Sequence, residues 1–286
     1  MLPLTHVCAR WRRTALGDPS LWTTIYSSQT TGPLLDMILA HAGSQLFTVF
    51  IDHHDLCRLI PVFLLVHRIE ELHYSIDLRQ LPTLLCSLGP APNLKVLHLR
   101  PEPAAGPGGL QLGIDLPSIF SGVLPSLRDL VLTGTVAWPI GLFGGLTSFE
   151  CGVLDHYPIS PVHVVGVLRE SPKLEVLRLV GSCKLPQEFN PPAVDLSSLR
   201  QCTLIGRGTT TLIRFITVPA SAGVLLGRPD PYNWPELPSF DDLSLASELH
   251  VVDDVSAVSI SIRDHMVHLQ VKKRPRRSSG CQGAWA

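Results

Sequence analysis

Apolar residues recur in one short pattern along the middle of the chain. Residues 172–179 read P-K-L-E-V-L-R-L and contain the phrase L-x-x-L-x-L, in which Leu177 and Leu179 lie two residues apart. In an extended strand these two side chains point to the same face. The phrase therefore predicts a strand with one apolar face at residues 174–179.

The same phrase returns several times before and after this stretch. Copies occupy residues 94–99, 127–132 and 199–204, the last with Cys202 in a leucine position, and weaker copies occupy residues 69–74 and 146–151. Successive copies start roughly 19 to 33 residues apart, which brackets the repeat of about 20–29 residues in leucine-rich repeats. Recurrence of one strand-containing unit is typical of a solenoid.

Helical patterns lie between the predicted strands, at residues 32–41, 56–66, 81–88, 117–124 and 160–171. The clearest is the last, where Ser160 is placed to cap the helix and Pro161 to take its first position. A strand–helix unit of this kind cannot bury its apolar face alone, so parallel stacking with the helices outside is favoured. The predicted fold class is α/β, a leucine-rich-repeat-like solenoid with a parallel sheet and outer helices.

Weaker patterns flank this region. Residues 46–51 alternate well enough for a first strand, and residues 211–218 fit a helix followed by a strand. Residues 258–262 and 266–271 alternate and predict an antiparallel end-piece that closes the edge of the sheet.

Polar residues between the leucines are expected to line the concave face of the sheet. The predicted target-binding residues are Lys95, His98, Arg128, Glu175 and Arg178, with Thr203 further along. The alternative for any one of them is an ordinary solvated side chain, since surface charges are common and usually idle.

Composition narrows the class of protein. The chain has 286 residues, of which 45% are hydrophobic and 16% charged, with a formal net charge of −1. This balance makes no case for a nucleic-acid partner, and no apolar run reaches the ~18 residues of a membrane span. Seven cysteines without C-x-x-C spacing indicate reduced thiols, and the N-terminal arginines follow the apolar residues, unlike a secretory signal. A cytoplasmic or nuclear protein is expected.

The first 25 residues form a separate unit. Trp11 and Ala15 lie on one face of a predicted helix that ends at Gly17, and residues 18–19 can cap and open a short second helix bearing Leu21 and Trp22. Two tryptophans in so short a segment require burial, against either the repeats or a second protein.

This segment resembles a known family. Residues 7–25, V-C-A-R-W-R-R-T-A-L-G-D-P-S-L-W-T-T-I, are similar to the C-terminal half of an F-box, in the version common in fungal families. The spacing C-x-x-W-R followed by P-x-L-W carries the resemblance. The matching positions are Val7, Cys8, Trp11, Arg12, Ala15, Pro19, Leu21, Trp22 and Ile25.

The resemblance implies a function. An F-box protein binds a Skp-type adaptor and a target, so that a cullin-RING ubiquitin ligase modifies the target. The adaptor-binding residues implied here are Val7, Cys8, Trp11, Leu21 and Trp22. A complete F-box opens with an L-P-x-E-type helix, which the six residues before the match do not encode. Either the gene model is truncated before the match, or the chain is a standalone scaffold that has lost adaptor binding, with both tryptophans buried as a cap on the solenoid.

Residue patterns for chemistry are weak, and we expect no catalytic residues, no metal and no cofactor. His53 and His54 adjoin Asp52, Asp55 and Cys57, but adjacent histidines point opposite ways and suit a turn better than a zinc site. The glycine-rich stretches 101–113 and 141–145 lack the lysine and flanking elements of a phosphate loop. The protein is expected not to be an enzyme, although catalytic groups can converge from distant positions.

Three segments are predicted: a partial F-box-like helical segment at 1–28, the solenoid at 29–271, and a basic tail at 272–286. The tail opens with K-K-R-P-R-R. Such a run suits either a disordered end or a nuclear address.

Overall fold

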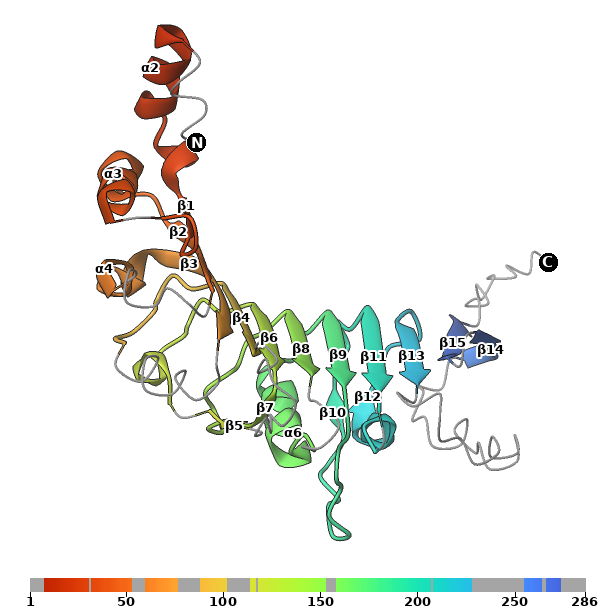
Figure 1. Ribbon diagram of the computed structural model, residues 1–286. Coiled ribbons are helices and arrows are strands. Elements are labelled where there is room, and N and C mark those ends of the chain that lie inside the picture. Colours follow the sequence, from red (N-terminus) through yellow and green to blue (C-terminus); the bar gives the residue numbers. More distant parts are fainter. Residues whose placement is uncertain are drawn as a thin grey trace, which may run out of the picture.

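The computed structural model describes residues 8–30, 32–52, 60–76, 88–101, 114–116, 118–152, 158–206, 208–227, 255–263 and 266–273. Its main feature is an 11-stranded sheet in which nine parallel strands follow one another in chain order (Figure 1). These nine strands are β1 (Thr24–Tyr26), β2 (Phe47–Ile51), β3 (Ile69–Ile76), β4 (Val96–Pro101), β6 (Asp129–Thr133), β8 (Ser148–Gly152), β9 (Val176–Val180), β11 (Gln201–Ile205) and β13 (Gly223–Gly227). The predicted α/β class and parallel sheet are confirmed.

The leucine phrases coincide with the strands. Each of the six copies contains one strand, from β3 to β11, and each of those strands begins at or shortly after the first apolar residue of its phrase. One line of paired residues crosses the sheet on its buried side, and we call it the inner row. It consists of Ile25, Val49, Leu72, Leu97, Leu130, Phe149, Leu177, Cys202 and Val224. All of these side chains are buried, so the period-two reading of the phrase holds in every copy.

The helices lie mostly on the side of the inner row. In Figure 1, α3 (Gly32–Ala42), α4 (Ile60–Phe63) and α6 (Pro161–Glu170) lie on one side of the sheet. Leu35 of α3, Val62 of α4 and Leu168 of α6 belong to the same apolar core as the inner row. The opposite side of the sheet, which we call the open face, receives no helix among the described residues.

The predicted helices are confirmed in part. Residues 32–41 and 160–171 correspond to α3 and α6, but Ser160 makes no side-chain capping hydrogen bond although it occupies the N-cap. Residues 117–124 contain only a 3-10 turn, η4 (Phe120–Gly122). Within 56–66 the described part contains α4, followed by η3 (Val66–Arg68), and 81–88 lies outside the described residues except for Leu88.

Part of the outer layer in the described residues is not helical. Two small parallel sheets take part in it, β5 (Ile114–Asp115) with β7 (Thr135–Ala137), and β10 (Val194–Asp195) with β12 (Ile216–Thr217). The predicted helix and strand at 211–218 correspond to η5 (Thr210–Phe215) followed by β12.

The C-terminal edge of the sheet is antiparallel. β15 (Met266–Lys273) pairs with β13, and β14 (Val255–Arg263) pairs with β15, which confirms the predicted end-piece. β15 includes Lys272 and Lys273, so the first two residues of the predicted basic tail belong to the sheet. The remainder of that tail, the stretch 101–113 apart from Pro101, and the cluster at 53–57 lie outside the described residues.

A close backbone approach joins two turns beyond the C-terminal ends of β9 and β11. Gly206 has a φ of +144°, and a Cβ at this position would overlap the carbonyl oxygen of Gly181. The buried Thr209 hydroxyl donates a hydrogen bond to the same carbonyl oxygen. The turn therefore requires glycine for both space and backbone conformation.

We predict that Gly206→Ala lowers the free energy of unfolding by more than about 1 kcal/mol, because the substitution adds both a steric overlap and backbone strain. Gly89→Ala is the matched control, since a Cβ there meets nothing within 4 Å. Urea denaturation followed by circular dichroism measures both variants. Equal midpoints for the two would contradict the close approach of the turns.

Candidate functional site

The open face has its own line of paired residues, one step out of phase with the inner row. This open-face row consists of Tyr26, Phe50, His73, His98, Val131, Glu150, Arg178, Thr203 and Leu225. Each member is the immediate neighbour of an inner-row residue on the same strand. The alternation that buries the leucines therefore places these side chains together on the other surface.

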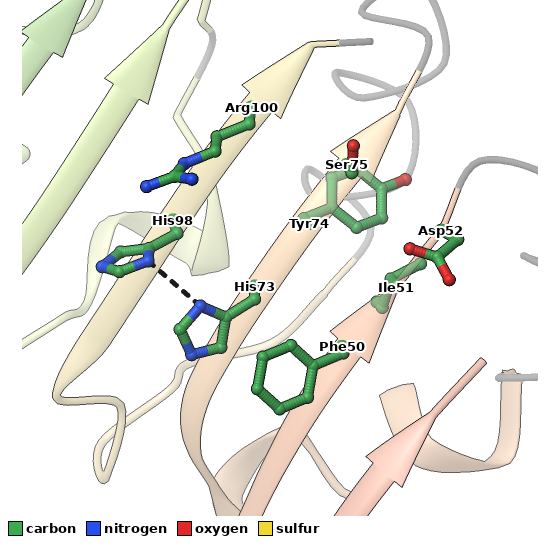
Figure 2. A pocket seen from close by; sticks show the side chains of 8 residues that line it. All are labelled: Phe50, Ile51, Asp52, His73, Tyr74, Ser75, His98 and Arg100. Carbon is green, nitrogen blue, oxygen red and sulfur yellow. Dashed lines mark hydrogen bonds between the residues drawn. The ribbon is translucent and has the colours of Figure 1, made fainter. Parts of the chain in front are cut away.

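The first four members are aromatic rings in contact, and we call them the aromatic ladder. The Tyr26 and Phe50 ring centroids lie 4.7 Å apart with an interplanar angle of 9°. Phe50 and His73 stack in the same way, at 4.5 Å and 11°. Figure 2 shows Phe50, His73 and His98 side by side on consecutive strands. Because each ring stands against the next, the ladder is a preformed and stiff surface.

The two histidines of the ladder are in direct polar contact. Nδ1 of His73 lies 3.0 Å from Nδ1 of His98, with the ring planes nearly perpendicular at 89°. One proton between two neutral imidazoles makes this an N–H···N hydrogen bond. Burial, and then the neighbouring His98, hold the pKa of His73 below its usual value, which favours the neutral ring.

A carboxylate faces the outer nitrogen of each ring. Oε2 of Glu71 lies 3.5 Å from Nε2 of His73, and Oδ1 of Asp129 lies 3.6 Å from Nε2 of His98. The His98 side chain is the main cause of a lowered pKa of the Asp129 carboxyl. The 3.6 Å separation is nevertheless longer than a hydrogen bond, so this attraction is weak in the present geometry.

Beside the ladder, the strand ends form a shallow hollow of about 210 Å³. Phe50, His73 and His98 line it on one side, and Asp52 and Arg100 line it further along the strands (Figure 2). The hollow thus combines flat aromatic surface with one carboxylate and one guanidinium. Such a combination can hold a side chain of a docked partner.

The second half of the open-face row is charged and aliphatic. Nη1 of Arg178 lies 3.8 Å from Oε2 of Glu150, and both side chains are substantially exposed. Exposed ion pairs of this kind contribute little to stability. The open face therefore presents an aromatic half near its N-terminal end and a charged half beyond Val131.

The predicted target-binding residues fall into two groups. His98 and Arg178 lie in the open-face row, as does Thr203. Lys95, Arg128 and Glu175 each stand just before the first residue of a central strand, β4, β6 and β9 respectively. Lys95 there pairs with Glu70 at 2.6 Å, and Glu175 pairs with Arg200 at 3.3 Å.

Sequence reasoning missed Tyr26, Phe50 and His73 as surface residues of this site. β1 and β2 lack the leucine phrase, and the Ile69 copy was read for its apolar residues only. The one available signal was the alternation around Phe50 in residues 46–51, which leaves that position on the face opposite Val49.

The two N-terminal tryptophans have different environments. Trp22, in η1 (Pro19–Trp22), is 1% exposed, and its Nε1 donates a 2.6 Å hydrogen bond to the Ala15 carbonyl oxygen. Trp11, in α2 (Ala9–Gly17), is 54% exposed. As predicted, α2 ends at Gly17, and the Asp18 carboxylate caps η1 by accepting from the Ser20 backbone N–H at 3.0 Å.

The other residues implied in adaptor binding are also divided. Cys8 is exposed, Leu21 is half-buried against the core, and Val7 lies outside the described residues. The surface available to a partner in this segment is therefore α2 with Trp11, and the buried surface is η1 with Trp22.

Three cysteines and His163, to which the sequence assigns no role, lie in surroundings that suit a structural role. Burial raises the pKa of Cys151 and Cys202 to about 12 and that of Cys183 to about 11. Protonated thiols of this kind are poor nucleophiles. Nδ1 of His163 accepts a 2.9 Å hydrogen bond from the Trp138 backbone N–H, which fixes the ring inside the fold.

Comparison of the chain with protein families, with curated proteins and with solved structures found no match. Within the described residues, no helix has the length and apolar character needed to cross a membrane. In that part of the chain, no group of three or more histidine, cysteine, aspartate or glutamate side chains is arranged to hold a metal ion.

We predict that Trp22→Ala lowers the free energy of unfolding by about 3–5 kcal/mol, because it leaves a large cavity beneath η1. Trp11→Ala is the matched control. Its free energy of unfolding should stay within about 0.5 kcal/mol of that of the parent chain, because the side chain removed is exposed. Thermal and urea unfolding report both values. A destabilised Trp11 variant would mean that α2 packs more tightly than its exposure indicates.

Proposed function

We propose that this chain is a non-enzymatic protein-interaction receptor with a leucine-rich-repeat-like solenoid and an F-box-type N-terminal segment. In this proposal the N-terminal segment holds a Skp-type adaptor and the open face holds a target protein. A cullin-RING ligase then attaches ubiquitin to the target. The observation that carries the target half is the aromatic ladder, whose first ring, Tyr26, is 42% exposed.

The order of the strands supports the solenoid. Each parallel strand from β1 to β13 pairs with the next main-sheet strand in the chain, and the inner row is continuous through all of them. Units that contact only their sequence neighbours and share one apolar line are the arrangement of repeat proteins.

The ladder supports recognition of a protein target. Aromatic side chains are over-represented among the residues that dominate binding energy at interfaces. Stacked rings are already ordered, so little side-chain entropy is lost when a partner covers them. The Glu150–Arg178 half contributes selectivity for partner charge more than affinity.

The exposed Trp11 supports the adaptor half. Only Ala15 is buried along α2, so the helix offers most of its circumference to a partner, with Trp11 in its first turn. Tryptophan is the residue type most enriched at binding hot spots. With an adaptor at α2 and a target on the open face, the ligase would act by raising the effective concentration of the target.

A second candidate is the standalone scaffold that has lost adaptor binding. The burial of Trp22 favours it, because a cap must cover the first apolar face of a solenoid. It requires Trp11 to be buried as well, and the 54% exposure of that side chain is why we rank it second.

We predict that the chain co-purifies with a Skp-type adaptor and that Trp11→Ala abolishes at least nine-tenths of the bound adaptor. The control is Val162→Ala, which alters another exposed apolar side chain, 46% exposed, on the remote helix α6. Co-expression followed by size-exclusion chromatography gives the ratio of the two proteins. Absence of adaptor from the folded parent chain would remove the ligase assignment and leave the standalone scaffold.

We also predict that Phe50→Ser removes proteins that crosslink to the parent chain in its native cells. This substitution interrupts the ladder between Tyr26 and His73, whereas Val162→Ser leaves the open face intact. Quantitative crosslinking mass spectrometry compares the three chains. The same crosslinked proteins at the same levels with Phe50→Ser would show that targets bind elsewhere.

A further inference from the structure

The two histidines of the open face are placed so that their Nδ1 atoms could share a ligand as well as a hydrogen bond. His73 on β3 and His98 on β4 are register partners on adjacent parallel strands. Each is held by the backbone ladder of the sheet, and no loop has to close to bring them together. Their Nδ1 atoms face each other at 3.0 Å (Figure 2).

We propose that His73 and His98 form a two-imidazole binding site for a divalent late transition-metal cation, Zn²⁺ or Cu²⁺, with the remaining coordination positions directed to the open face. The site stands on the residues of this chain alone and does not depend on the proposed receptor function. Water or an atom of a docked partner would complete the coordination.

The separation of the two nitrogens fits a shared metal ion. A metal–nitrogen distance of about 2.0–2.1 Å places two ligand nitrogens about 2.9 Å apart at a right angle and about 3.3 Å apart at the tetrahedral angle. The observed 3.0 Å lies between these values. Small rotations of the rings are therefore sufficient to replace the single shared proton with a cation.

The outer nitrogens provide an independent observation. A metal-bound histidine usually donates its other N–H to a carboxylate, which orients the ring and increases its basicity. Glu71 faces Nε2 of His73 at 3.5 Å, and Asp129 faces Nε2 of His98 at 3.6 Å. In the described part of the structure, His98 Nε2 and Asp129 Oδ1 are buried without a hydrogen-bond partner. Coordination through Nδ1 fixes the proton on Nε2 and gives each of these two atoms the other as its partner.

The local charge also favours a cation. Two carboxylates flank two imidazoles, and a ring that stays neutral keeps a lone pair free for a metal. After burial and His98, Arg100 contributes a positive charge that helps to lower the pKa of His73, but in Figure 2 its guanidinium lies beside His98 and outside the gap between the two rings.

Isothermal titration with Zn²⁺ tests the proposal in the full chain, with Cys8→Ser as background because the exposed Cys8 thiol is itself a zinc ligand. We expect a binding step that His73→Ala and His98→Ala each weaken at least tenfold. His67→Ala is the matched control, because His67 is exposed on η3 away from the pair, and it should bind as the background chain does. Asp129→Asn should weaken binding by about 10–100-fold through loss of ring orientation.

A second measurement does not depend on the folding of the variants. In the otherwise unmutated background chain labelled with ¹⁵N, added Zn²⁺ should move the Nδ1 resonances of His73 and His98 together, and Cu²⁺ should show hyperfine coupling to two imidazole nitrogens by electron paramagnetic resonance. Unchanged Zn²⁺ affinity in both histidine variants, or unmoved Nδ1 signals at saturating metal, would overturn the site and leave an N–H···N hydrogen bond only.

Discussion

The structure depends on a single register, kept from β1 to β13, that pairs each strand with the next. Side chains alternate with a period of two along a strand, so a shift of one residue would exchange the two faces. At β4, such a shift would turn Leu97 and Leu99 to the open face and bury His98 and Arg100. The cost of exposing two leucines and burying a guanidinium holds the register at each strand. The inner row and the open-face row are therefore two consequences of the same constraint.

This coupling explains why a continuous aromatic surface can form on strands whose other face is the apolar core. The buried residues of β2, β3 and β4 place Phe50, His73 and His98 at intervals of one strand spacing, about 4.8 Å. That spacing suits stacked rings, and the centroid distances of 4.5–4.7 Å follow from it. Beyond Val131 the same row carries Glu150 and Arg178, whose charges meet at 3.8 Å. One register thus yields two neighbouring surfaces of different chemistry.

Much of this architecture was predictable from the sequence, because the spacing of leucines within a strand shows which of its faces is apolar. Leu97, Leu130 and Leu177 all lie buried on strands of one sheet, as the phrase predicts. The site was harder to predict because it is formed by contacts between neighbouring strands, which the sequence of a single strand does not reveal. His73 and His98 are 25 residues apart, and only the pairing of β3 with β4 makes them neighbours. Strand starts are also hard to place from sequence. The leucine phrase predicts Lys95, Arg128 and Glu175 on the open face, but each of their strands begins one residue later.

The elements outside the sheet were predicted less well than its strands. The elements predicted outside the sheet are helices, but the described part of residues 117–124 contains the 3-10 turn η4 instead. In two stretches for which no element is predicted, the chain forms the short strands β7 and β10. A buried apolar face needs only to be covered, and short strands and 3-10 turns cover it as well as helices do. Phe120, which lies in the 3-10 turn η4, is fully buried. Periodicity therefore predicts the inner layer better than the cover.

The N-terminal segment places one buried and one exposed tryptophan in one short sequence. Trp22 closes the first apolar face, and its indole N–H is satisfied by the carbonyl oxygen of Ala15 in α2. That hydrogen bond ties the end of α2 to the first residues of the sheet domain, while the exposed Trp11 stands on the preceding turn of the same helix. Burial of one tryptophan thus positions the other, so the cap and the adaptor interpretations of this segment differ only in whether a second protein covers Trp11. Any partner bound there is held at a fixed distance from the aromatic ladder, because η1 leads directly into β1 and Tyr26.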